Sequence, residues 1–362
     1  MPSVNCREKQ QSLAPRIGSC ISPNLKGWKR FEWVFGGLYP GPLLYWSGPN
    51  RIRYAVNSLR ISIVQYLNTA PLVRGFTHGA LRKKYQLSFT VPSQCADALR
   101  MNAADIAIIP AIEYPRIQNL VVLPGLSIAS KRAVRSLLLV STKPVREVSR
   151  IALDRSSRST QALVRILCQK WWGIAPELIE AEPDLPAMLQ KSHAALLIGD
   201  PALRLALNVE QYTERDRAGV LRCSGKSVGF PGIPTLYLYD MVEEWRALSG
   251  LPAVLAVWAA RPEVATPEVV RDFQESLAQG LLQLDEISAE ASKEMGLPVS
   301  DLRRYLTENI DYGLDEENLQ GLRLFFSLAA ELGLIPGAPE IVMARAARAS
   351  ERDSELACER RR

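Results

Sequence analysis

Short apolar runs of strand length alternate with amphipathic segments of helical length from residue 59 onward. The first run, LRISIV at 59–64, is rich in β-branched residues and long enough for a buried strand. It is followed by the polar pair Asn68 and Thr69 and then by Pro71, which suits the first turn of a helix. We therefore expect a strand that leaves a sheet near Tyr66 and passes directly into a helix. In open α/β sheets, ligands bind at this kind of corner.

The alternation of strand and helix signals continues along most of the chain and is typical of α/β proteins with parallel sheets. After the first strand, the pattern predicts strands at 87–91, 105–114, 120–129, 136–141, 150–154, 177–182, 194–201 and 252–262. It predicts helices at 93–101, 161–172, 185–192, 237–250, from 267 onward, and at 300–310 and 316–333. Asn102 and Gly173 follow two of these helices, and both residue types suit a left-handed helix end.

The order of the elements predicts two α/β lobes with a hinge and an inter-lobe cleft. A change of composition at Thr142-Lys143-Pro144 indicates the first crossing, and the strand at 252–262 returns to the first lobe. This is the architecture of the periplasmic-binding-protein type II fold, from which function alone cannot be inferred. The predicted divisions are lobe 1 at 57–143 and 255–345, lobe 2 at 144–254, a disordered extension or mis-annotated start at 1–56, and a charged tail at 346–362.

Charge and composition narrow the classes of partner. The net charge of +6 comes from scattered arginines, and no basic run carries the interleaved aromatics of a nucleic-acid surface. We therefore predict no nucleic-acid partner and favour a small anionic ligand. No stretch approaches the roughly 20 apolar residues needed to span a bilayer, and no cleavage site follows the apolar N-terminal run. We expect a cytoplasmic protein without a membrane span.

The sequence predicts neither a metal site nor a catalytic mechanism centred on a histidine. The six cysteines form no CxxC pair, and His78 and His193 are the two histidines of the chain. A zinc site needs closely spaced ligands, and a histidine-centred mechanism needs a histidine among the polar strand ends. The cysteines are expected to be reduced structural thiols.

Hydroxyl-rich segments follow the predicted strands at the proposed cleft. Ser93 lies at one helix start, and Ser157, Ser159 and Thr160 lie at another. Free N–H groups and the helix dipole favour an anion at such ends, so one site on each lobe suits a ligand with two anionic groups. Ordinary alternatives remain open: simple N-capping by these hydroxyls, a turn in which Asn68 bonds its own backbone, and helix capping or pairing with an arginine by Asp200.

Taken together, these segments resemble the chorismate dehydratase family of the futalosine route to menaquinone. The resemblance rests on YLNTAPL at 66–72, PSQCADALRMNAADIAIIPAIEY at 92–114, LDRSSRSTQALVRILC at 153–168, AALLIGDPAL at 194–203, YDMVEEWRALSGLPAVLAVWAAR at 239–261 and YLTENIDYGLDEENLQGLRLFF at 305–326. It implies an enzyme that removes water from chorismate to give 3-[(1-carboxyvinyl)oxy]benzoate, without a cofactor or metal. It also implies catalytic roles for Asn68 and Ser136, and substrate contacts from Thr69, Ser93, Ser130, Ser157, Ser159, Thr160 and Asp200.

This chain departs from the family pattern at three places. The serine segment reads SKRAVRSLLL, so the choice between Ser130 and Ser136 stays open. The order Ser159-Thr160 is swapped relative to the usual Thr-Ser, and Asn102 stands where a glycine is usual.

The implied chemistry fits a site that is poor in strong bases. The enolpyruvyl carboxylate of the substrate would take the ring proton, while Asn68 and Ser136 hydrogen-bond the carboxylates or the leaving hydroxyl. Catalysis would then rest on orientation and electrostatic stabilisation. Two alternatives are a related later-pathway enzyme, which forms dihydroxynaphthoate from cyclic dehypoxanthinyl futalosine, and a non-catalytic solute-binding protein. The sequence predicts no oligomeric state.

Overall fold

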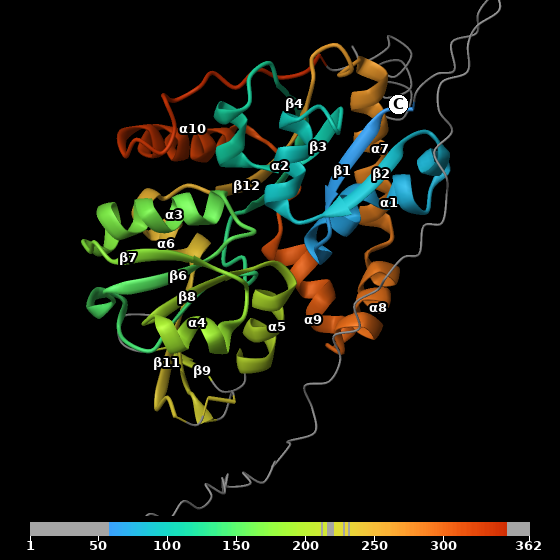
Figure 1. Ribbon diagram of the computed structural model, residues 1–362. Coiled ribbons are helices and arrows are strands. Elements are labelled where there is room, and N and C mark those ends of the chain that lie inside the picture. Colours follow the sequence, from blue (N-terminus) through green and yellow to red (C-terminus); the bar gives the residue numbers. More distant parts are fainter. Residues whose placement is uncertain (1–57, 211–212, 216–220, 227–228, 231, 346–362) are drawn as a thin grey trace, which may run out of the picture. The chain divides into compact units, whose positions relative to one another are not determined.

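Two β-sheets form the framework of the computed structural model, which describes residues 58–210, 213–215, 221–226, 229–230 and 232–345 (Figure 1). The predictions for residues 1–56 and 346–362 lie outside this part of the chain. We refer to each sheet with its helices as a lobe, and the two-lobed α/β architecture predicted from the sequence is confirmed.

The first sheet mixes parallel and antiparallel pairing. Its strand order is β2 (Gln86–Thr90), β1 (Arg60–Val64), β3 (Ile106–Pro110), β12 (Ala253–Ala260) and β4 (Val121–Ser130). β1 runs parallel to β2 and β3, whereas β12 runs antiparallel to β3 and β4. All five residues of β3 are buried, as expected for a strand covered on both faces.

The second sheet has the order β7 (Glu177–Ala181), β6 (Arg150–Asp154), β8 (Ala194–Ile198), β5 (Leu137–Ser141), β11 (Thr235–Asp240), β10 (Leu221–Ser224) and β9 (Thr213–Arg215). β6 is parallel to β7 and β8, and the strands from β5 onward are antiparallel to their neighbours.

The helices are α1 (Ala70–Thr77), α2 (Pro92–Arg100), α3 (Ser159–Leu167), α4 (Leu185–Lys191), α5 (Gly199–Val209), α6 (Met241–Ser249), α7 (Pro267–Leu282), α8 (Leu284–Met295), α9 (Val299–Arg304) and α10 (Glu316–Glu331). None of these described helices is long and apolar enough to cross a membrane. Asn102 and Gly173 have φ values of 56° and 67°, so the left-handed helix ends predicted at both positions are confirmed.

α1 follows β1 directly and is held tightly against α7. A Cβ added to Gly280 of α7 would lie 2.0 Å from the Pro71 carbonyl oxygen, so a side chain at this position would push the helices apart. The Ser276 hydroxyl of α7 also bonds α1, accepting from Gly75 N at 3.0 Å and donating to the Leu72 carbonyl at 2.8 Å. This packing fixes the helix that begins beside Asn68.

The first crossing between the lobes lies earlier than predicted. β5 pairs with β8 and β11 in the second sheet, so residues 137–141 do not belong to the first sheet. The chain therefore changes lobes between Ser130 and Leu137 rather than at the predicted hinge, Thr142–Pro144. The sequence prediction was wrong here because an apolar strand carries no local sign of which sheet it joins. The return crossing lies between α6 and β12, close to the predicted position.

Two predicted elements divide differently in the structure. The segment at 237–250 is not one helix, because its first residues complete β11 and the Asp240 side chain then caps α6 by accepting from Val242 N at 2.9 Å. The strand predicted at 194–201 ends at Ile198, because Gly199 has φ +65° and begins α5. Asp200 therefore lies in the first turn of a helix.

Candidate active site

The ends of several strands meet at a pocket between the two sheets, which we call the inter-sheet pocket. It is lined by Val64, Tyr66, Asn68, Thr69, Pro92, Ile108, Pro110, Ile128, Leu137, Ser157, Ser159, Thr160, Ile198, Gly199, Leu255 and Ala256. The structure thus brings together five predicted site residues from distant parts of the chain: Asn68, Thr69, Ser157, Ser159 and Thr160.

Asn68 lies in a single 3₁₀ turn, Leu67–Thr69, between β1 and α1. The turn is closed by its own backbone, since Thr69 N donates to the Tyr66 carbonyl at 3.0 Å. The Thr69 hydroxyl donates to Asn68 Oδ1 at 3.3 Å. The Asn68 side chain is therefore bonded to a neighbouring side chain, whereas the alternative interpretation had it bonding its own backbone.

The hydroxyl residues at the start of α3 take part in hydrogen bonds with the backbone. They are Ser157, Ser159 and Thr160. Ser157 Oγ accepts from Thr160 N at 3.3 Å. Ser159 Oγ accepts from the backbone N of Ile112 at 3.2 Å, a bond between elements of the two lobes. All three side chains are buried. The capping alternative therefore describes Ser157, whereas the Ser159 hydroxyl joins the two lobes, and all three residues line the pocket.

Ser136 is buried immediately before Leu137, which lines the pocket. It follows Arg135, whose φ of 62° is unusual for a residue with a side chain. The Asp240 carboxylate stabilises this conformation by accepting from Arg135 N at 2.6 Å. Burial raises the pKa of Asp240 to about 6, against the lowering effect of the backbone N–H groups that it binds.

Tyr305 joins this group, although sequence reasoning did not select it. It lies in a π-helical turn, Tyr305–Asn309, that continues α9, and its Oη donates to Ser136 Oγ at 2.9 Å. Burial raises the pKa of this phenol well above its ordinary value. The residue lies within the motif at 305–326, but no local pattern distinguishes it from a core aromatic residue.

Three predicted contact residues do not line the inter-sheet pocket. Ser130 is bound within its own turn, where its Oγ donates to the Arg132 carbonyl at 2.8 Å. Ser93 meets the second lobe through its backbone, whose N donates to the Ser156 carbonyl at 3.1 Å. Asp200 accepts from Leu67 N at 3.0 Å and so supports the turn that carries Asn68.

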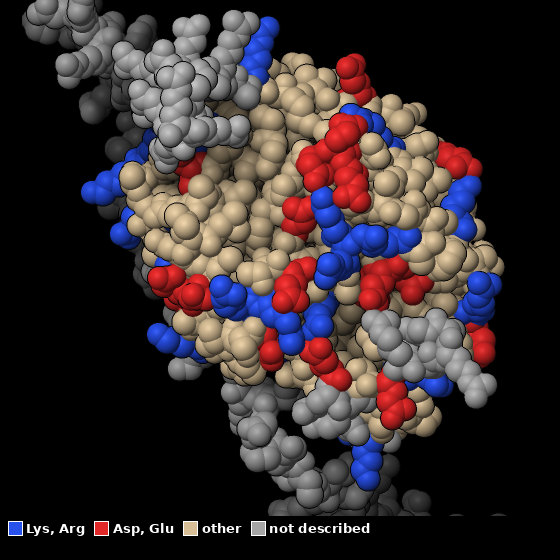
Figure 2. Space-filling view, turned by 180° about the vertical axis from the view of Figure 1, so that it is seen from behind, with Lys and Arg blue, Asp and Glu red and all other residues tan. Residues whose placement is uncertain are grey.

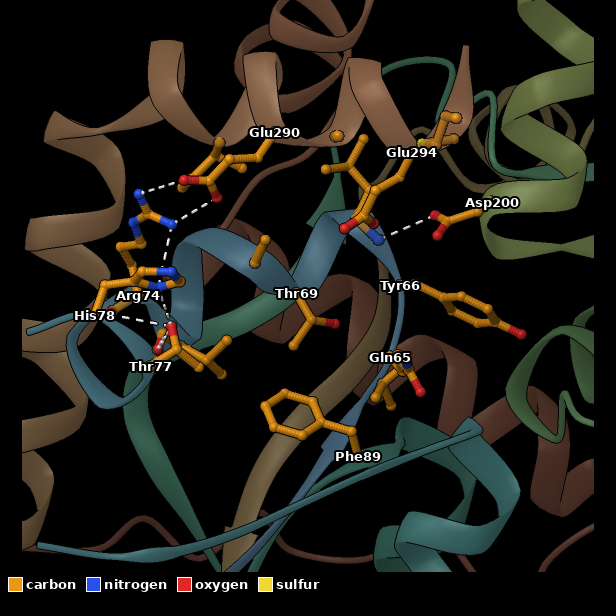
Figure 3. Close-up of a pocket in the computed structure, with 17 residues that line it drawn as sticks. Gln65, Tyr66, Thr69, Arg74, Thr77, His78, Phe89, Asp200, Glu290 and Glu294 are labelled. Carbon is orange, nitrogen blue, oxygen red and sulfur yellow. Dashed lines mark hydrogen bonds and ion pairs between the residues drawn. The ribbon is translucent and has the colours of Figure 1, made fainter. Parts of the chain in front are cut away.

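Asp200 faces a second, larger pocket of about 270 Å³, which we call the side pocket (Figure 3). Glu290 and Glu294 also line it. The Arg74 guanidinium donates two hydrogen bonds of 2.8 and 3.0 Å to the Glu290 carboxylate. Burial raises the pKa of Asp200 to about 6, while the bond from Leu67 N lowers it. With several carboxylates in its wall, the side pocket is unsuited to a dianion in spite of its size.

The inter-sheet pocket, in contrast to the side pocket, has an uncharged wall. Its lining contains no acidic or basic side chain, and the N-termini of four helices reach it: Thr69 precedes α1, while Pro92, Ser159 and Gly199 begin α2, α3 and α5. Positive helix ends and hydroxyl donors in a pocket free of carboxylates favour an anionic ligand. Among the residues that the structure describes, no cluster of three histidine, cysteine or acidic side chains could hold a metal ion.

On the face of the molecule in Figure 2, basic side chains lie beside acidic ones. Ion pairs also occur among exposed side chains, for example between Arg150 and Glu177 at 2.7 Å. The described cysteines Cys95, Cys168 and Cys223 are buried and unpaired.

Residues 59–331 match a family model described as menaquinone biosynthesis. The chain belongs to this family. The resemblance inferred from the motifs is thereby confirmed. A chorismate dehydratase of Thermus thermophilus is 28% identical over 283 residues, which are 77% of this chain and 96% of that protein.

Solved structures agree with the family's two-lobed fold. A protein from Archaeoglobus fulgidus has a TM-score of 0.58 at 18% identity, over 78% of this chain and all (100%) of that one. The periplasmic aliphatic sulphonate binding protein of Escherichia coli has a TM-score of 0.51 at 18% identity, over 81% of this chain and 95% of its own. At these identities the likeness establishes the periplasmic-binding-protein-like fold alone.

Proposed function

We propose that this chain is a chorismate dehydratase, a carbon–oxygen lyase that converts chorismate into 3-[(1-carboxyvinyl)oxy]benzoate and water. The observation that carries the proposal is the inter-sheet pocket, where four helix N-termini and several hydroxyls surround an uncharged wall that includes Asn68. Chorismate carries two carboxylates, and such a pocket stabilises both without a lysine or arginine. The similarity to the dehydratase of Thermus thermophilus supports the same substrate.

The reaction breaks the ring C–H bond beside the ether oxygen and the neighbouring C–OH bond. The electron pair of the C–H bond forms the last double bond of the aromatic ring, and hydroxide leaves as water after taking up a proton. No carboxylate or histidine lines the pocket, so the enolpyruvyl carboxylate of the substrate is the base that we propose. Aromatisation supplies the driving force.

The protein's part is to hold the substrate in a reactive conformation. The amide N–H groups of Asn68 are directed away from Thr69, whose hydroxyl occupies Oδ1, and can donate to a carboxylate or to the leaving hydroxyl. Ser136 adjoins the pocket at Leu137, and we propose that its hydroxyl assists the same groups. Orientation and preorganised donors of this kind account for large rate accelerations without a strong protein base.

A second candidate is a solute-binding protein, because several structures with this fold bind solutes, as their names state. Incubating the purified full-length chain with chorismate separates the candidates. An aromatic ultraviolet spectrum that grows as chorismate disappears supports the dehydratase. Binding of chorismate in calorimetry without product would favour the solute-binding alternative, and absence of binding would favour the later-pathway enzyme.

A further inference from the structure

Tyr305 is hydrogen-bonded to Ser136, one of the two residues to which we assign the chemistry. Its Oη donates to Ser136 Oγ at 2.9 Å. Ser136 lies immediately before β5 of the second sheet, and Tyr305 follows it 169 positions later in the chain. The phenol and the serine hydroxyl are therefore brought together only by the fold.

The segment that carries Tyr305 is fixed against the chain that carries Ser136. Asn309 Nδ2 donates to the Ala133 carbonyl at 2.7 Å. Asp311 exchanges two backbone hydrogen bonds of 2.8 Å with Ala129. Because the C-terminal end of the turn Tyr305–Asn309 is bound to residues 129–133, the backbone holds this turn beside the segment that leads to Ser136.

We propose that Tyr305 is a positioning residue for the dehydration, which directs the hydroxyl of Ser136 without itself touching the substrate. This inference rests on the proposed function. A phenol has one proton, and Tyr305 donates it to Ser136 Oγ. The hydroxyl proton of Ser136 is then free to point elsewhere, towards the pocket.

Burial also keeps Tyr305 a donor. It raises the pKa of the phenol well above its ordinary value, so the phenol keeps its proton at neutral pH. Tyr305 therefore remains able to donate to Ser136 Oγ while the reaction takes place.

Replacement of the phenol by a phenyl ring tests this role. Y305F keeps the ring that packs in the core and removes only the hydroxyl. We expect kcat for chorismate to fall on the order of 10- to 100-fold, with KM changed by less than about threefold, because alignment in the reaction is lost while binding is retained. In a Ser136→Ala background, Y305F should cause no further loss of kcat, since its target is already absent.

Tyr312 supplies a matched control. It is also a buried tyrosine, and its hydroxyl has no hydrogen-bond partner in the described part of the chain. Y312F should keep wild-type kcat and KM. If the wild type is active and Y305F has the same kcat as Y312F, the role of Tyr305 is overturned while the proposed function stands. The same follows if the double variant loses kcat by the product of the two single losses, from Y305F and from Ser136→Ala. An inactive wild-type protein would overturn the proposed function and with it this role.

A crystal structure of the wild-type protein with 3-[(1-carboxyvinyl)oxy]benzoate decides the matter if Y305F does not fold. The positioning role predicts that Tyr305 Oη stays on Ser136 Oγ and does not contact the bound product. A direct bond from Tyr305 to the product, or a separation from Ser136 beyond hydrogen-bonding distance, would contradict it.

Discussion

The side chain of Asn68 is oriented within its own turn, because the hydroxyl of the neighbouring Thr69 donates to its Oδ1. The Asp200 carboxylate also fixes the backbone of this turn, because it accepts a hydrogen bond from Leu67 N. The sequence indicated the polar corner at residues 66–69, because a strand that stops on Asn-Thr before a proline is a local pattern. It could not indicate Tyr305, whose importance depends on contacts with residues more than a hundred positions away.

Two substitutions at Asn68 separate orientation from charge. Asn68→Ala removes the donors, and we expect kcat on chorismate to fall on the order of 100-fold or more. Asn68→Asp has nearly the same shape but places a carboxylate in a pocket without charged residues. Its KM should therefore rise well above that of Asn68→Ala, because the substrate is a dianion. Steady-state kinetics measure both.

Asn208→Ala is the control for these variants, because Asn208 is exposed on α5 outside the pocket. It should match the wild type. Wild-type turnover by Asn68→Ala would show that the inter-sheet pocket is not the site of reaction.

Asp200 gives the stability a defined pH dependence. Its pKa is raised from 3.8 to about 6 by burial, so the folded protein binds this proton more tightly than the unfolded chain does. The associated stabilisation is complete below about pH 4 and is lost as the pH rises through 6. Asp200→Asn keeps an acceptor for Leu67 N without the charge. Relative to Asp200→Asn, the wild type should lose about 3 kcal/mol of unfolding free energy between about pH 4 and pH 8.

Urea unfolding at a series of pH values measures this difference. Asp285→Asn serves as the reference, because the Asp285 side chain is 78% exposed. A constant difference between Asp200→Asn and the wild type across this range would mean that Asp200 titrates near its ordinary pKa.

Helix ends that carry a local sequence signal could be predicted, whereas features that depend on pairing with distant strands could not. Asn102 and Gly173 end helices in the left-handed conformation that their residue types suggest. The sheet joined by β5 depends instead on its pairing with β8 and β11, which no short pattern contains. The strand predicted at 194–201 extended past the start of α5, a helix that was not predicted, because the apolar run gives no sign that the strand ends before Gly199.

Gly199 is where α5 meets the turn that carries Asn68. Its φ is +65°, and an added Cβ would lie 2.6 Å from the ring of Tyr66. Gly199→Ala should therefore move Tyr66 or α5, and lower both stability and kcat. We expect a loss of more than about 2 kcal/mol of unfolding free energy.

Gly296→Ala is a closely matched comparison. Gly296 has φ +66°, but a Cβ there meets nothing within 4 Å. It should lose only about 1 kcal/mol, the cost of the backbone conformation, and keep full activity. Equal losses of unfolding free energy in Gly199→Ala and Gly296→Ala would indicate that the Tyr66 ring moves away from the added methyl group without loss of stability.

On the scale of the whole molecule, bonds between the lobes surround the inter-sheet pocket. Arg158, between the pocket residues Ser157 and Ser159, bonds Asp97 at 2.8 Å and Glu113 at 3.1 Å in the first lobe. The backbone bond from Ser93 to Ser156 lies in the same region. We expect such contacts to stabilise a closed arrangement of the two lobes around the pocket.

Arg158→Gln should weaken this closure while leaving Glu113 paired, since Arg100 and Arg116 also bond that buried carboxylate. We expect KM for chorismate to rise about tenfold, equivalent to about 1.4 kcal/mol, with a smaller change in kcat. Arg155→Gln removes an exposed ion pair with Glu182 within the second lobe and should leave KM unchanged. The same KM in both variants would argue against a role of Arg158 in closure.

The most direct measurement follows chorismate and its product by proton NMR in the presence of wild-type protein and of Asn68→Ala at equal concentration. With the wild type, chorismate should convert in equal amounts into 3-[(1-carboxyvinyl)oxy]benzoate, with catalytic turnover. With Asn68→Ala, the rate should fall on the order of 100-fold. Chorismate that persists with the folded wild-type protein, or product that forms equally fast with both, would contradict dehydration in the inter-sheet pocket.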